Sequence, residues 1–421
     1  MPSADGYKNL EWPRPLTSPS IFTCTLASHQ LNYLGSQQHE WQKVAKIIET
    51  SCQTVQSTPL LKMVRLSTLL PTISALGCAR GVRFLGRVNP ATRELSWSGT
   101  GLTFSFTGSS ASVAVASSWG TNSIEMVIDN GTPLVFDSVN GTSIATPAAL
   151  ADGSHTVSIR KRSEAQFGSI YVGDVSTLGT LSNDTAPASR RIQIIGDSIT
   201  VGYGMDGTYP CVNSAALEDA PNSYGALTAK NLSAEYDIVA WSGKGLVRNT
   251  VNPGYEDDVV MPQIWTRWAA SDADGTYTFP AADTPDVVVV NLGTNDFSYV
   301  ATNSSTGATY DARPRLNATA YTEAMVAFVK TIQGNYPDTE VFITSSPLLS
   351  DGYPTAEDAQ HTTQADAIKD AVAQLGSRAH FVEFPTQDSS NNNIGCDYHP
   401  SSATHESMAV ILTAAIEDVT A

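Results

Sequence analysis

Basic residues are scarce in this chain. Of its 421 residues, 24 are Lys or Arg and 41 are Asp or Glu, which gives a formal net charge of −17. Proteins that bind nucleic acid or anionic membranes do so through clustered Lys and Arg side chains. The composition therefore predicts no nucleic-acid partner and no membrane partner, and it favours a neutral substrate. Because only 15% of the residues are charged, we expect a surface rich in uncharged Ser, Thr and Asn.

The motifs of several large enzyme classes are also missing. The sequence contains no Gly-x-Ser-x-Gly elbow, no Gly-x-x-x-x-Gly-Lys phosphate loop and no His-Glu-x-x-His zinc motif. Assignments as an α/β-hydrolase, a P-loop nucleotide hydrolase or a zinc protease therefore lack their motifs. The sequence implies no metal and no other cofactor, and it has no long apolar lid of the kind that a lipase needs.

Long hydrophobic runs are absent as well. The run at residues 66–76 is too short to span a bilayer. It follows a basic residue, Arg65, and precedes small residues that include Ala79, which is the order found in secretory signal peptides. We therefore predict a signal peptide over residues 63–79, with a buried strand or helix as the alternative. Residues 1–62 show no domain pattern and are interpreted as a non-native or disordered extension.

Residues 80–175 have the pattern of an antiparallel β domain. Short alternating apolar and polar runs recur between turn signals, for example at residues 102–106. Asn-Gly pairs at 130–131 and 140–141 are strong hairpin turns. This spacing predicts a jelly-roll-like β-sandwich. A linker is expected over residues 176–190, where Gly, Asn, Pro and Ser are frequent.

From residue 191 the pattern changes to strands that alternate with helices. Residues 287–290 are four consecutive valines, as a strand buried on both faces requires. The alternation predicts an α/β domain over residues 191–421, with a parallel sheet between helices. The expected strands are 191–196, 236–241, 286–292, 339–345 and 379–384, and the expected helices are 222–233, 318–334, 361–375 and 402–418.

The most informative stretch lies at the end of the first of these strands. The apolar run from residue 191 ends in Gly-Asp-Ser at 196–198, and a glycine-rich turn follows. Open α/β sheets place their ligands at the carboxyl ends of their strands, so Ser198 is expected to face a ligand. Two further blocks lie downstream: Gly-Thr-Asn-Asp at 293–296, after the third strand, and Asp-Tyr-His-Pro at 397–400.

These blocks, in this order, resemble those of the SGNH (GDSL-type) hydrolases. Trp-Ser-Gly-Lys-Gly at 241–245 stands where that family has its glycine block. The resemblance covers about residues 190–421 and implies a flavodoxin-like hydrolase domain. A β-sandwich before such a domain is similar to carbohydrate esterase family 2, the acetyl-xylan and acetyl-glucan esterases. Trp-Ser-Gly at 97–99, Arg-Lys-Arg-Ser-Glu at 160–164 and Gly-Cys-Asp-Tyr-His-Pro at 395–400 add to this narrower resemblance.

Ser198 is the expected nucleophile, because a serine hydroxyl becomes reactive when a base lies within hydrogen-bond reach. His399 is the expected base, which takes the Ser198 proton and passes it to the leaving alcohol. Asp397 is expected to orient His399 as the acid of a triad. The SGNH family usually has Asp-x-x-His, and the spacing here is one residue shorter. A Ser-His dyad oriented by a backbone carbonyl is therefore the alternative. His405, on the last helix, is expected to be structural.

Donors for a developing oxyanion are expected from three places. They are the backbone N–H of Ser198, a glycine N–H after the second strand and the side-chain amide of Asn295. Gly245 fits the glycine position slightly better than Gly243. Asn295 has an alternative role as an Asx-turn residue. The neighbouring carboxylates Asp197 and Asp296 are expected to fix loop geometry.

Three aromatic residues lie beside the blocks. Tyr398 directly precedes His399, while Trp241 and Tyr203 flank the glycine and serine blocks. Flat rings stack on sugar faces, so Tyr398 and Trp241 are candidate substrate-binding residues. Burial in the core is the alternative for each of them.

The cysteines are few and unevenly placed. Cys24, Cys52 and Cys78 precede the mature domains, which leaves Cys211 after the serine loop and Cys396 before the histidine loop. An even pair in an exported protein favours a disulfide, and two unrelated buried thiols are the alternative. Glycosylation of an exported protein agrees with the Asn-x-Ser/Thr sequons, which lie at Asn130, Asn140, Asn183, Asn231, Asn303 and Asn317.

The resemblance thus implies a secreted, monomeric serine esterase that removes O-acetyl groups from plant-cell-wall polysaccharide such as acetylated xylan or glucomannan. One alternative is an SGNH esterase or lipase that acts on lipid or small acyl esters. The other is a catalytically inert protein that binds carbohydrate.

Overall fold

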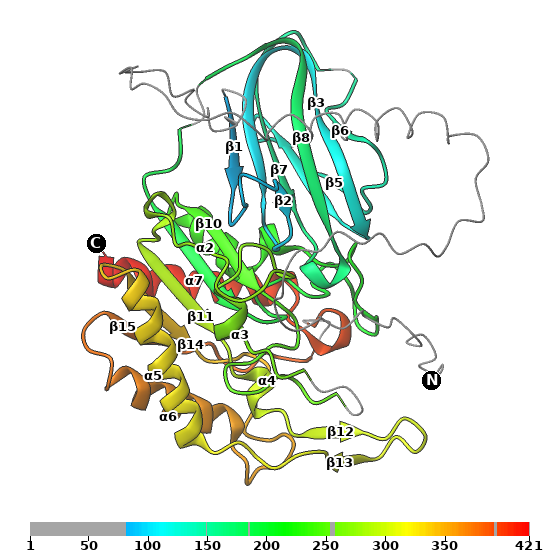
Figure 1. Ribbon diagram of the computed structural model, residues 1–421. Coiled ribbons are helices and arrows are strands. Elements are labelled where there is room, and N and C mark those ends of the chain that lie inside the picture. The colour runs from blue at the N-terminus through cyan, green and yellow to red at the C-terminus, as the bar shows by residue number, and fades with distance from the viewer. Residues whose placement is uncertain (1–80, 149, 184–185, 253–256, 391–393, 421) are drawn as a thin grey trace, which may run out of the picture. The chain divides into compact units, whose positions relative to one another are not determined.

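The computed structural model describes residues 81–148, 150–183, 186–252, 257–390 and 394–420 (Figure 1). All of these residues fall in a single unit. The extension expected at 1–62, the signal peptide expected at 63–79 and the three N-terminal cysteines lie outside the described residues.

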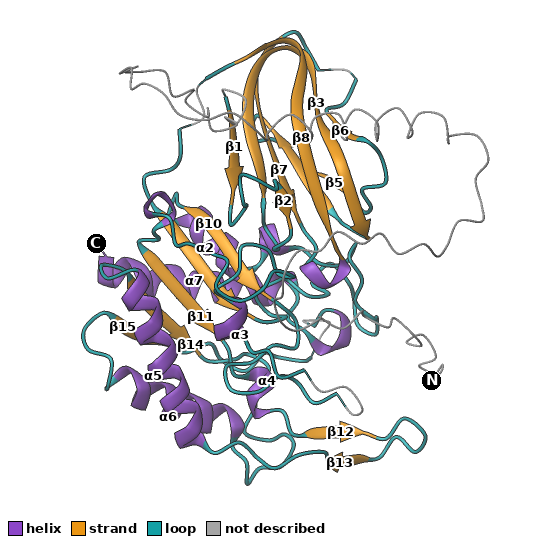
Figure 2. Ribbon diagram, viewed as in Figure 1, coloured by secondary structure: helices purple, strands orange, loops and turns teal. Residues whose placement is uncertain are grey.

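The N-terminal domain is an antiparallel β structure, as predicted, and Figure 2 shows that it is built almost entirely of strands. β3 is long enough to take part in two groups of strands. Its first half pairs with β1 and β7, and its second half pairs with β6 and β8. The strands are β1 (Val82–Leu85), β2 (Glu94–Leu95), β3 (Gly101–Gly120), β4 (Ile124–Ile128), β5 (Leu134–Phe136), β6 (Ser143–Ala145), β7 (Gly153–Lys161) and β8 (Gly168–Leu181).

One apolar core fills this domain. Phe104 and Ile159 come from the first group of strands, whereas Val113 and Val172 come from the second, and all four are buried in the same cluster. The alternation in the sequence therefore corresponds to the folded domain, in which every second residue of these strands faces the core.

The boundary expected at residue 175 needs correction. β8 continues to Leu181, so the connection to the next domain begins later than residue 176. Gly179 lies in the expected linker, but it pairs with Gly108 of β3. Both have a φ near +150°, and a Cβ on Gly179 would lie 1.8 Å from the Thr107 carbonyl oxygen. Here glycine allows a close approach of two strands rather than marking a loop.

The second domain has a five-stranded parallel sheet in the order β10-β9-β11-β14-β15, which is the flavodoxin-like order. All five strands match the predicted ranges to within two residues at each end. They are β9 (Arg191–Gly196), β10 (Glu235–Ala240), β11 (Val287–Asn291), β14 (Glu340–Thr344) and β15 (Ala379–Val382).

Helices cover both faces of this sheet, and β11 shows why. Val288 and Val290 belong to the core beneath α5 and α6, whereas Val287 and Val289 belong to the core beneath α2 and α7. All four valines are fully buried, and each such side chain contributes roughly 1.5–3 kcal/mol. The four expected helices are α2 (Tyr224–Asn231), α5 (Ala318–Asn335), α6 (Gln360–Val372) and α7 (Ser402–Thr420).

Several short elements are not predicted by the sequence, because none is long enough to show a period. They are α3 (Met261–Ile264), α4 (Thr294–Phe297), the hairpin β12 (Val300–Thr302) with β13 (Thr309–Asp311), and 3₁₀ turns at Ala165–Phe167, Ala220–Asn222, Ala281–Asp283 and Cys396–Tyr398. The Gly-Thr-Asn-Asp block at 293–296 thus forms the start of α4.

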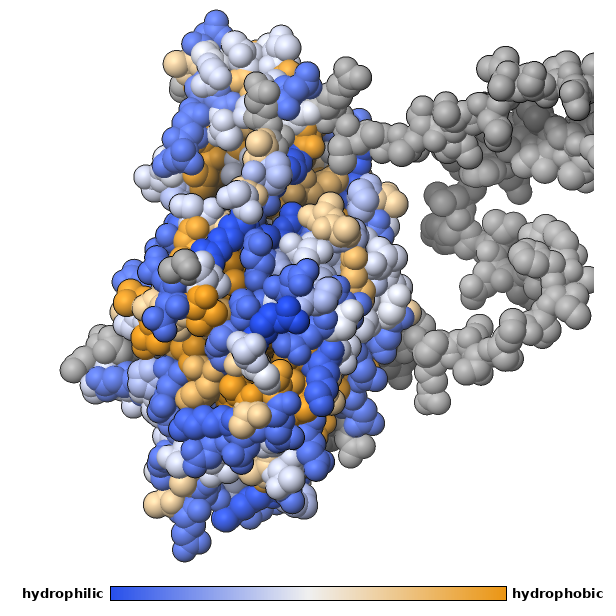
Figure 3. Space-filling view, turned by 90° about the vertical axis from the view of Figure 1, so that its left-hand side faces the viewer, coloured by the Kyte–Doolittle hydropathy of each residue, from blue (hydrophilic) through white to orange (hydrophobic). Residues whose placement is uncertain are grey.

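No helix in the described part of the chain is long and apolar enough to cross a membrane. On the face that Figure 3 presents, hydrophilic residues predominate and apolar residues lie in small groups between them.

Candidate active site

Ser198 lies just beyond the carboxyl end of β9, the second strand of the sheet order. A tight turn presents it there, because the Asp197 carbonyl accepts the N–H groups of Thr200 (3.1 Å) and Val201 (3.2 Å). The Asp197 carboxylate also accepts the N–H of Ile199 at 3.0 Å. Ser198 is 6% exposed. Its side chain therefore sits in a fixed position at the edge of the sheet where parallel α/β proteins bind ligands.

The structure brings His399 to Ser198, as predicted. His399 Nε2 lies 2.8 Å from Ser198 Oγ, which is a normal hydrogen bond. Burial lowers the pKa of His399 to about 4, against its ordinary 6.5. The imidazole is consequently neutral around pH 7, with a lone pair available to accept the Ser198 proton.

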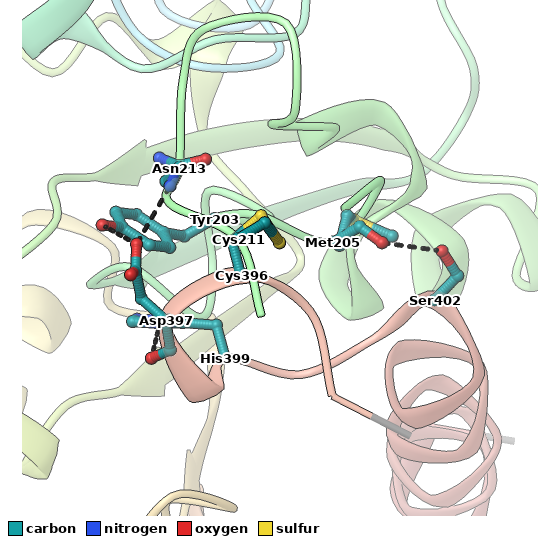
Figure 4. The surroundings of a disulfide bond; sticks show 8 residues. All are labelled: Tyr203, Met205, Cys211, Asn213, Cys396, Asp397, His399 and Ser402. Carbon is teal, nitrogen blue, oxygen red and sulfur yellow. Dashed lines mark hydrogen bonds between the residues drawn. A yellow bond between two sulfur atoms is a disulfide. The ribbon is translucent and has the colours of Figure 1, made fainter. Parts of the chain in front are cut away.

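The structure does not bring the Asp397 carboxylate to His399, which contradicts the expected triad. Asp397 Oδ2 instead accepts the hydroxyl of Tyr203 (3.1 Å) and the backbone N–H of Asn213 (2.9 Å). The Asp397 carbonyl oxygen lies 3.2 Å from His399 Nδ1. Figure 4 shows the carboxylate turned toward Asn213 and Tyr203 and the carbonyl turned toward the ring. The observed arrangement is the alternative, a Ser-His dyad with a backbone acceptor.

The backbone conformation accounts for this outcome. Asp397 has φ 51° and Tyr398 has φ 65°, so both are in the left-handed region, whereas the prediction assumes an extended segment in which residues 397 and 399 share a face. This conformation costs a non-glycine residue about 1–2 kcal/mol, and strain of this kind concentrates at functional sites.

The predicted disulfide between Cys211 and Cys396 is confirmed. It joins the loop after Ser198 to the loop before His399, across 185 residues of sequence. Backbone hydrogen bonds add to it: Cys396 N–H donates to the Gly204 carbonyl (3.0 Å) and Asp397 N–H donates to the Cys211 carbonyl (3.1 Å). The two loops that carry the dyad are therefore held together both covalently and by hydrogen bonds.

Among the backbone donors considered from the sequence, the N–H groups of Ser198 and Gly243 have no hydrogen-bond partner within the described residues. The N–H of Gly245, the other glycine considered, is already engaged, because it donates to Asn249 Oδ1 at 3.1 Å. Gly243, the alternative, has φ +79°, and this left-handed turn is one that glycine adopts without strain. The backbone donors available for an oxyanion are thus Ser198 and Gly243.

Asn295 lies beside this loop and is 7% exposed. Its amide nitrogen donates to Asp197 Oδ2 (3.1 Å) and to the Lys244 carbonyl (2.8 Å). Both amide hydrogens are engaged, so Asn295 ties the serine loop to the glycine loop. Donation to an oxyanion would require one of these bonds to be exchanged, and this role stays a prediction.

The two carboxylates next to these residues fix loop geometry, as expected. Asp296 accepts the N–H groups of Leu246 (2.9 Å), Val247 (2.6 Å) and Arg248 (3.1 Å). Burial raises the pKa of Asp296 and raises that of Asp197 to about 7.

The candidate substrate-binding aromatics lie in different surroundings. Tyr398 is 56% exposed, and its hydroxyl lies 2.6 Å from that of Tyr209, with ring centroids 4.5 Å apart. Tyr203 packs on His399, with ring centroids 4.1 Å apart. Trp241 is partly buried and lines a cavity of about 900 Å³ together with Gly243. Neither Ser198 nor His399 lines that cavity.

His405 is structural, as expected. It is fully buried, and its Nδ1 accepts the backbone N–H of Tyr224 (3.1 Å) at the start of α2. The described residues contain no group of His, Cys, Asp and Glu side chains that could hold a metal ion.

Sequence reasoning missed Glu164, which reaches this site from the N-terminal domain. Its carboxylate accepts the backbone N–H (2.8 Å) and the hydroxyl (2.5 Å) of Ser242. The contact joins two segments that are distant in the sequence. Nothing in the local sequence Arg-Lys-Arg-Ser-Glu indicates that Glu164 bonds to the glycine block.

Two family models match the chain. "Carbohydrate esterase 2 N-terminal" matches residues 84–181, and "GDSL-like Lipase/Acylhydrolase family" matches residues 194–406, about half of the chain. The first match ends where β8 ends and the second begins within β9.

Individual relatives agree with these models. The crystal structure of a carbohydrate esterase family 2 enzyme plus carbohydrate binding domain from Corynascus thermopiles (Myceliophthora fergusii) is 53% identical, with a TM-score of 0.76, and the match covers 80% of this chain and 99% of that one. Cellulase/esterase CelE of Acetivibrio thermocellus is 33% identical over 80% of this chain and 39% of its own length, so the chain spans about two fifths of that relative. An acetylxylan esterase / glucomannan deacetylase of Cellvibrio japonicus is 26% identical over 80% of this chain and 88% of its own length.

The serine–histidine pair on a flavodoxin-like sheet, the antiparallel domain before it and these matches agree with one another. The chain belongs to carbohydrate esterase family 2.

Proposed function

We propose that the protein is a secreted serine esterase that removes O-acetyl groups from plant-cell-wall polysaccharide through an acyl-enzyme. The observation that carries this proposal is the 2.8 Å contact between Ser198 Oγ and His399 Nε2 at the carboxyl end of β9.

In the first step, His399 Nε2 accepts the Ser198 proton while Ser198 Oγ forms a bond to the acetyl carbon. The imidazolium that forms is stabilised by the Asp397 carbonyl oxygen, which accepts a hydrogen bond from Nδ1–H. His399 then donates the proton from Nε2 to the leaving sugar oxygen, and the bond between that oxygen and the acetyl carbon breaks. The acetyl group remains on Ser198.

Negative charge collects on the acetyl carbonyl oxygen during this step. The N–H groups of Ser198 and Gly243 are the donors that can meet it, and the amide of Asn295 becomes a third if it exchanges one of its present bonds. A preorganised donor of this kind is worth about 3 kcal/mol in the transition state.

In the second step, His399 takes a proton from water as the water oxygen attacks the acetyl carbon. His399 then gives this proton to Ser198 Oγ as the bond between Oγ and the acetyl carbon breaks, and acetic acid leaves and loses its remaining proton to solvent as acetate forms. The reaction needs no redox change and no group beyond the protein and water.

The aromatic residues and the relatives support a sugar substrate. Tyr398 exposes a ring directly beside the base, and Tyr209 stands next to it. Such rings offer an apolar face on which a pyranose can stack. The Cellvibrio japonicus relative is named an acetylxylan esterase / glucomannan deacetylase, so we extend this substrate class to the present chain. Export is supported by the disulfide, since such bonds persist in oxidising compartments, and by the sequons, which would then carry glycans.

The test is acetate release from acetylated xylan and acetylated glucomannan by the full chain and by its Ser198→Ala variant. We expect release by the parent and none by the variant. Cleavage of a small aryl acetate without release from either polymer would refute the polysaccharide assignment and favour an esterase for other acyl esters. If the parent hydrolyses none of these substrates but binds the polymers, the result would favour a carbohydrate-binding protein.

A further inference from the structure

We propose that Glu164 of the N-terminal domain is a positioning residue of the esterase site, so that this domain completes the active centre rather than acting as a separate module. The inference rests on the proposed function. Glu164 would act through other residues, because its carboxylate is buried and bonded to Ser242 of the glycine loop.

The first contact is with the glycine loop. Glu164 Oε2 accepts the Ser242 backbone N–H at 2.8 Å, and Oε1 accepts the Ser242 hydroxyl at 2.5 Å. Gly243, whose N–H is free to meet an oxyanion, is the next residue. These two hydrogen bonds to Ser242 fix the orientation of the Ser242–Gly243 peptide, which carries this N–H donor. The preorganisation of such a donor determines how strongly it stabilises the transition state.

The second contact leads to the histidine loop. The Glu164 backbone N–H donates to Glu218 Oε2 at 2.6 Å, and Glu218 Oε1 accepts the side-chain amide of Asn213 at 2.8 Å. The Asn213 backbone N–H donates in turn to Asp397 Oδ2 at 2.9 Å. Asp397 supplies the carbonyl that faces His399. A continuous chain of hydrogen bonds therefore runs from the oxyanion loop through Glu164 to the residue that orients the base.

The surroundings of Glu164 hold this series of hydrogen bonds in a buried and closely bonded environment. Glu164, Glu218 and Lys161 are all fully buried. Lys161 Nζ donates to the carbonyls of Ser163 (2.7 Å) and Glu164 (3.0 Å), and Gln166 donates to Glu164 Oε1. Burial, and then the charge of Glu164, raise the pKa of Glu218 well above its ordinary value. Buried acidic groups are costly for stability, so their presence between two catalytic loops fits a functional role better than a purely structural one.

The test compares Glu164→Gln with a control at the same domain interface. Gln keeps the size of the side chain, but it replaces one of the two carboxylate oxygens with an NH2 group. This group is a donor, and it would face a donor of Ser242, so one of the two hydrogen bonds to Ser242 is lost. Arg83→Gln is the matched control, because Arg83 of β1 forms an ion pair with Glu235 of β10 at 2.6 Å and neither contacts the catalytic loops. For full-length Glu164→Gln on a small aryl acetate, we expect kcat to fall about 10- to 100-fold, because small misplacements of catalytic groups cause losses of this size. KM should change less than about threefold, and Arg83→Gln should keep the parental kcat.

Hydrogen exchange gives a readout that does not depend on activity. Amides in residues 241–250 and 394–400 should exchange faster in Glu164→Gln than in the parent, and they should be unchanged in Arg83→Gln. Equal kcat and equal exchange in Glu164→Gln and the parent would overturn the inference while leaving the esterase proposal standing. Should the parent hydrolyse no ester, the proposed function fails, and the exchange data alone decide whether Glu164 couples the loops.

A second variant covers the case in which Glu164→Gln fails to fold. Ser242→Ala removes one of the two contacts from the loop side and leaves the buried carboxylate in place. It should lower kcat about 3- to 10-fold and speed exchange at 241–250. A folded Ser242→Ala protein with parental kcat and parental exchange would contradict the proposal.

Discussion

The Asp397 carbonyl oxygen lies 3.2 Å from His399 Nδ1, and the carboxylate of the same residue points away to Tyr203 and Asn213. The base is thus oriented by the main chain of its own loop. This relationship separates the site from a Ser-His-Asp triad, in which a buried carboxylate accepts the bond from Nδ1–H.

Asp397→Asn should therefore be tolerated. The side-chain oxygen of Asn can still accept the Tyr203 hydroxyl and the Asn213 N–H, while the negative charge is lost and the carbonyl to His399 is kept. We expect kcat on an aryl acetate to fall less than about tenfold, against the roughly 10⁴-fold loss on removing the acid of a triad. His399→Ala is the reference for complete loss of kcat. An equal loss of kcat in Asp397→Asn would support a Ser-His-Asp triad instead of the dyad.

The pH profile follows from the burial of His399. Burial lowers its pKa from 6.5 to about 4, so the neutral imidazole persists as the pH falls from 7 to 5, and the lone pair is lost only as the pH passes about 4. We expect kcat/KM on an aryl acetate to be nearly constant between pH 7 and 5 and to decline with an apparent pKa near 4. Circular dichroism at each pH separates this decline from acid unfolding. A decline centred near 6.5 would contradict the burial argument.

Much of the architecture could be predicted from the sequence because long elements carry strong periodic signals. The four valines of β11 face two separate cores, and a run of this kind suits few positions besides a central strand. Glycine is the weak point: the composition around Gly179 suggests a linker, yet this residue lies within β8 where two strands approach closely. A residue type alone does not distinguish these two uses.

The site was predictable to the level of residue identity but not of contacts. Ser198, His399 and the disulfide pair follow from motif order and cysteine parity. The orientation of Asp397 depends on two left-handed residues in succession, and the choice between Gly243 and Gly245 depends on the side chain of Asn249. These are properties of the folded loops, and no spacing rule contains them.

Asn295→Ala tests the third oxyanion donor. If the amide exchanges its bond to Asp197 or to Lys244 for one to the developing oxyanion, its loss should lower kcat about 10²- to 10³-fold with little change in KM. The measurement is steady-state kinetics on an aryl acetate, with the melting temperature as a control for the lost ties between loops. A change in melting temperature with parental kcat would limit Asn295 to a structural role.

Tyr398→Ala tests the sugar-stacking ring. Removing an exposed aromatic face should weaken binding of a polysaccharide by about 1 kcal/mol, which corresponds to about a fivefold lower kcat/KM on acetylated xylan. Hydrolysis of a small aryl acetate should be nearly unchanged, because it needs no sugar contact. Tyr353→Ala is the matched control, since Tyr353 is 62% exposed and belongs to none of the loops discussed. Equal losses on both substrates would assign Tyr398 to the dyad loop rather than to substrate binding.

The Cys211–Cys396 disulfide should couple stability to activity. It closes a loop of 185 residues, and native disulfides in such loops contribute about 2–5 kcal/mol, chiefly by restricting the unfolded chain. The double substitution to Ser should therefore lower the melting temperature. It should also lower kcat well below the folding transition, because Asp397 follows Cys396 directly and its carbonyl must stay beside His399. A double variant with a lower melting temperature but parental kcat at 25 °C would mean that the hydrogen bonds from Cys396 to Gly204 and from Asp397 to Cys211 suffice to hold the base in place.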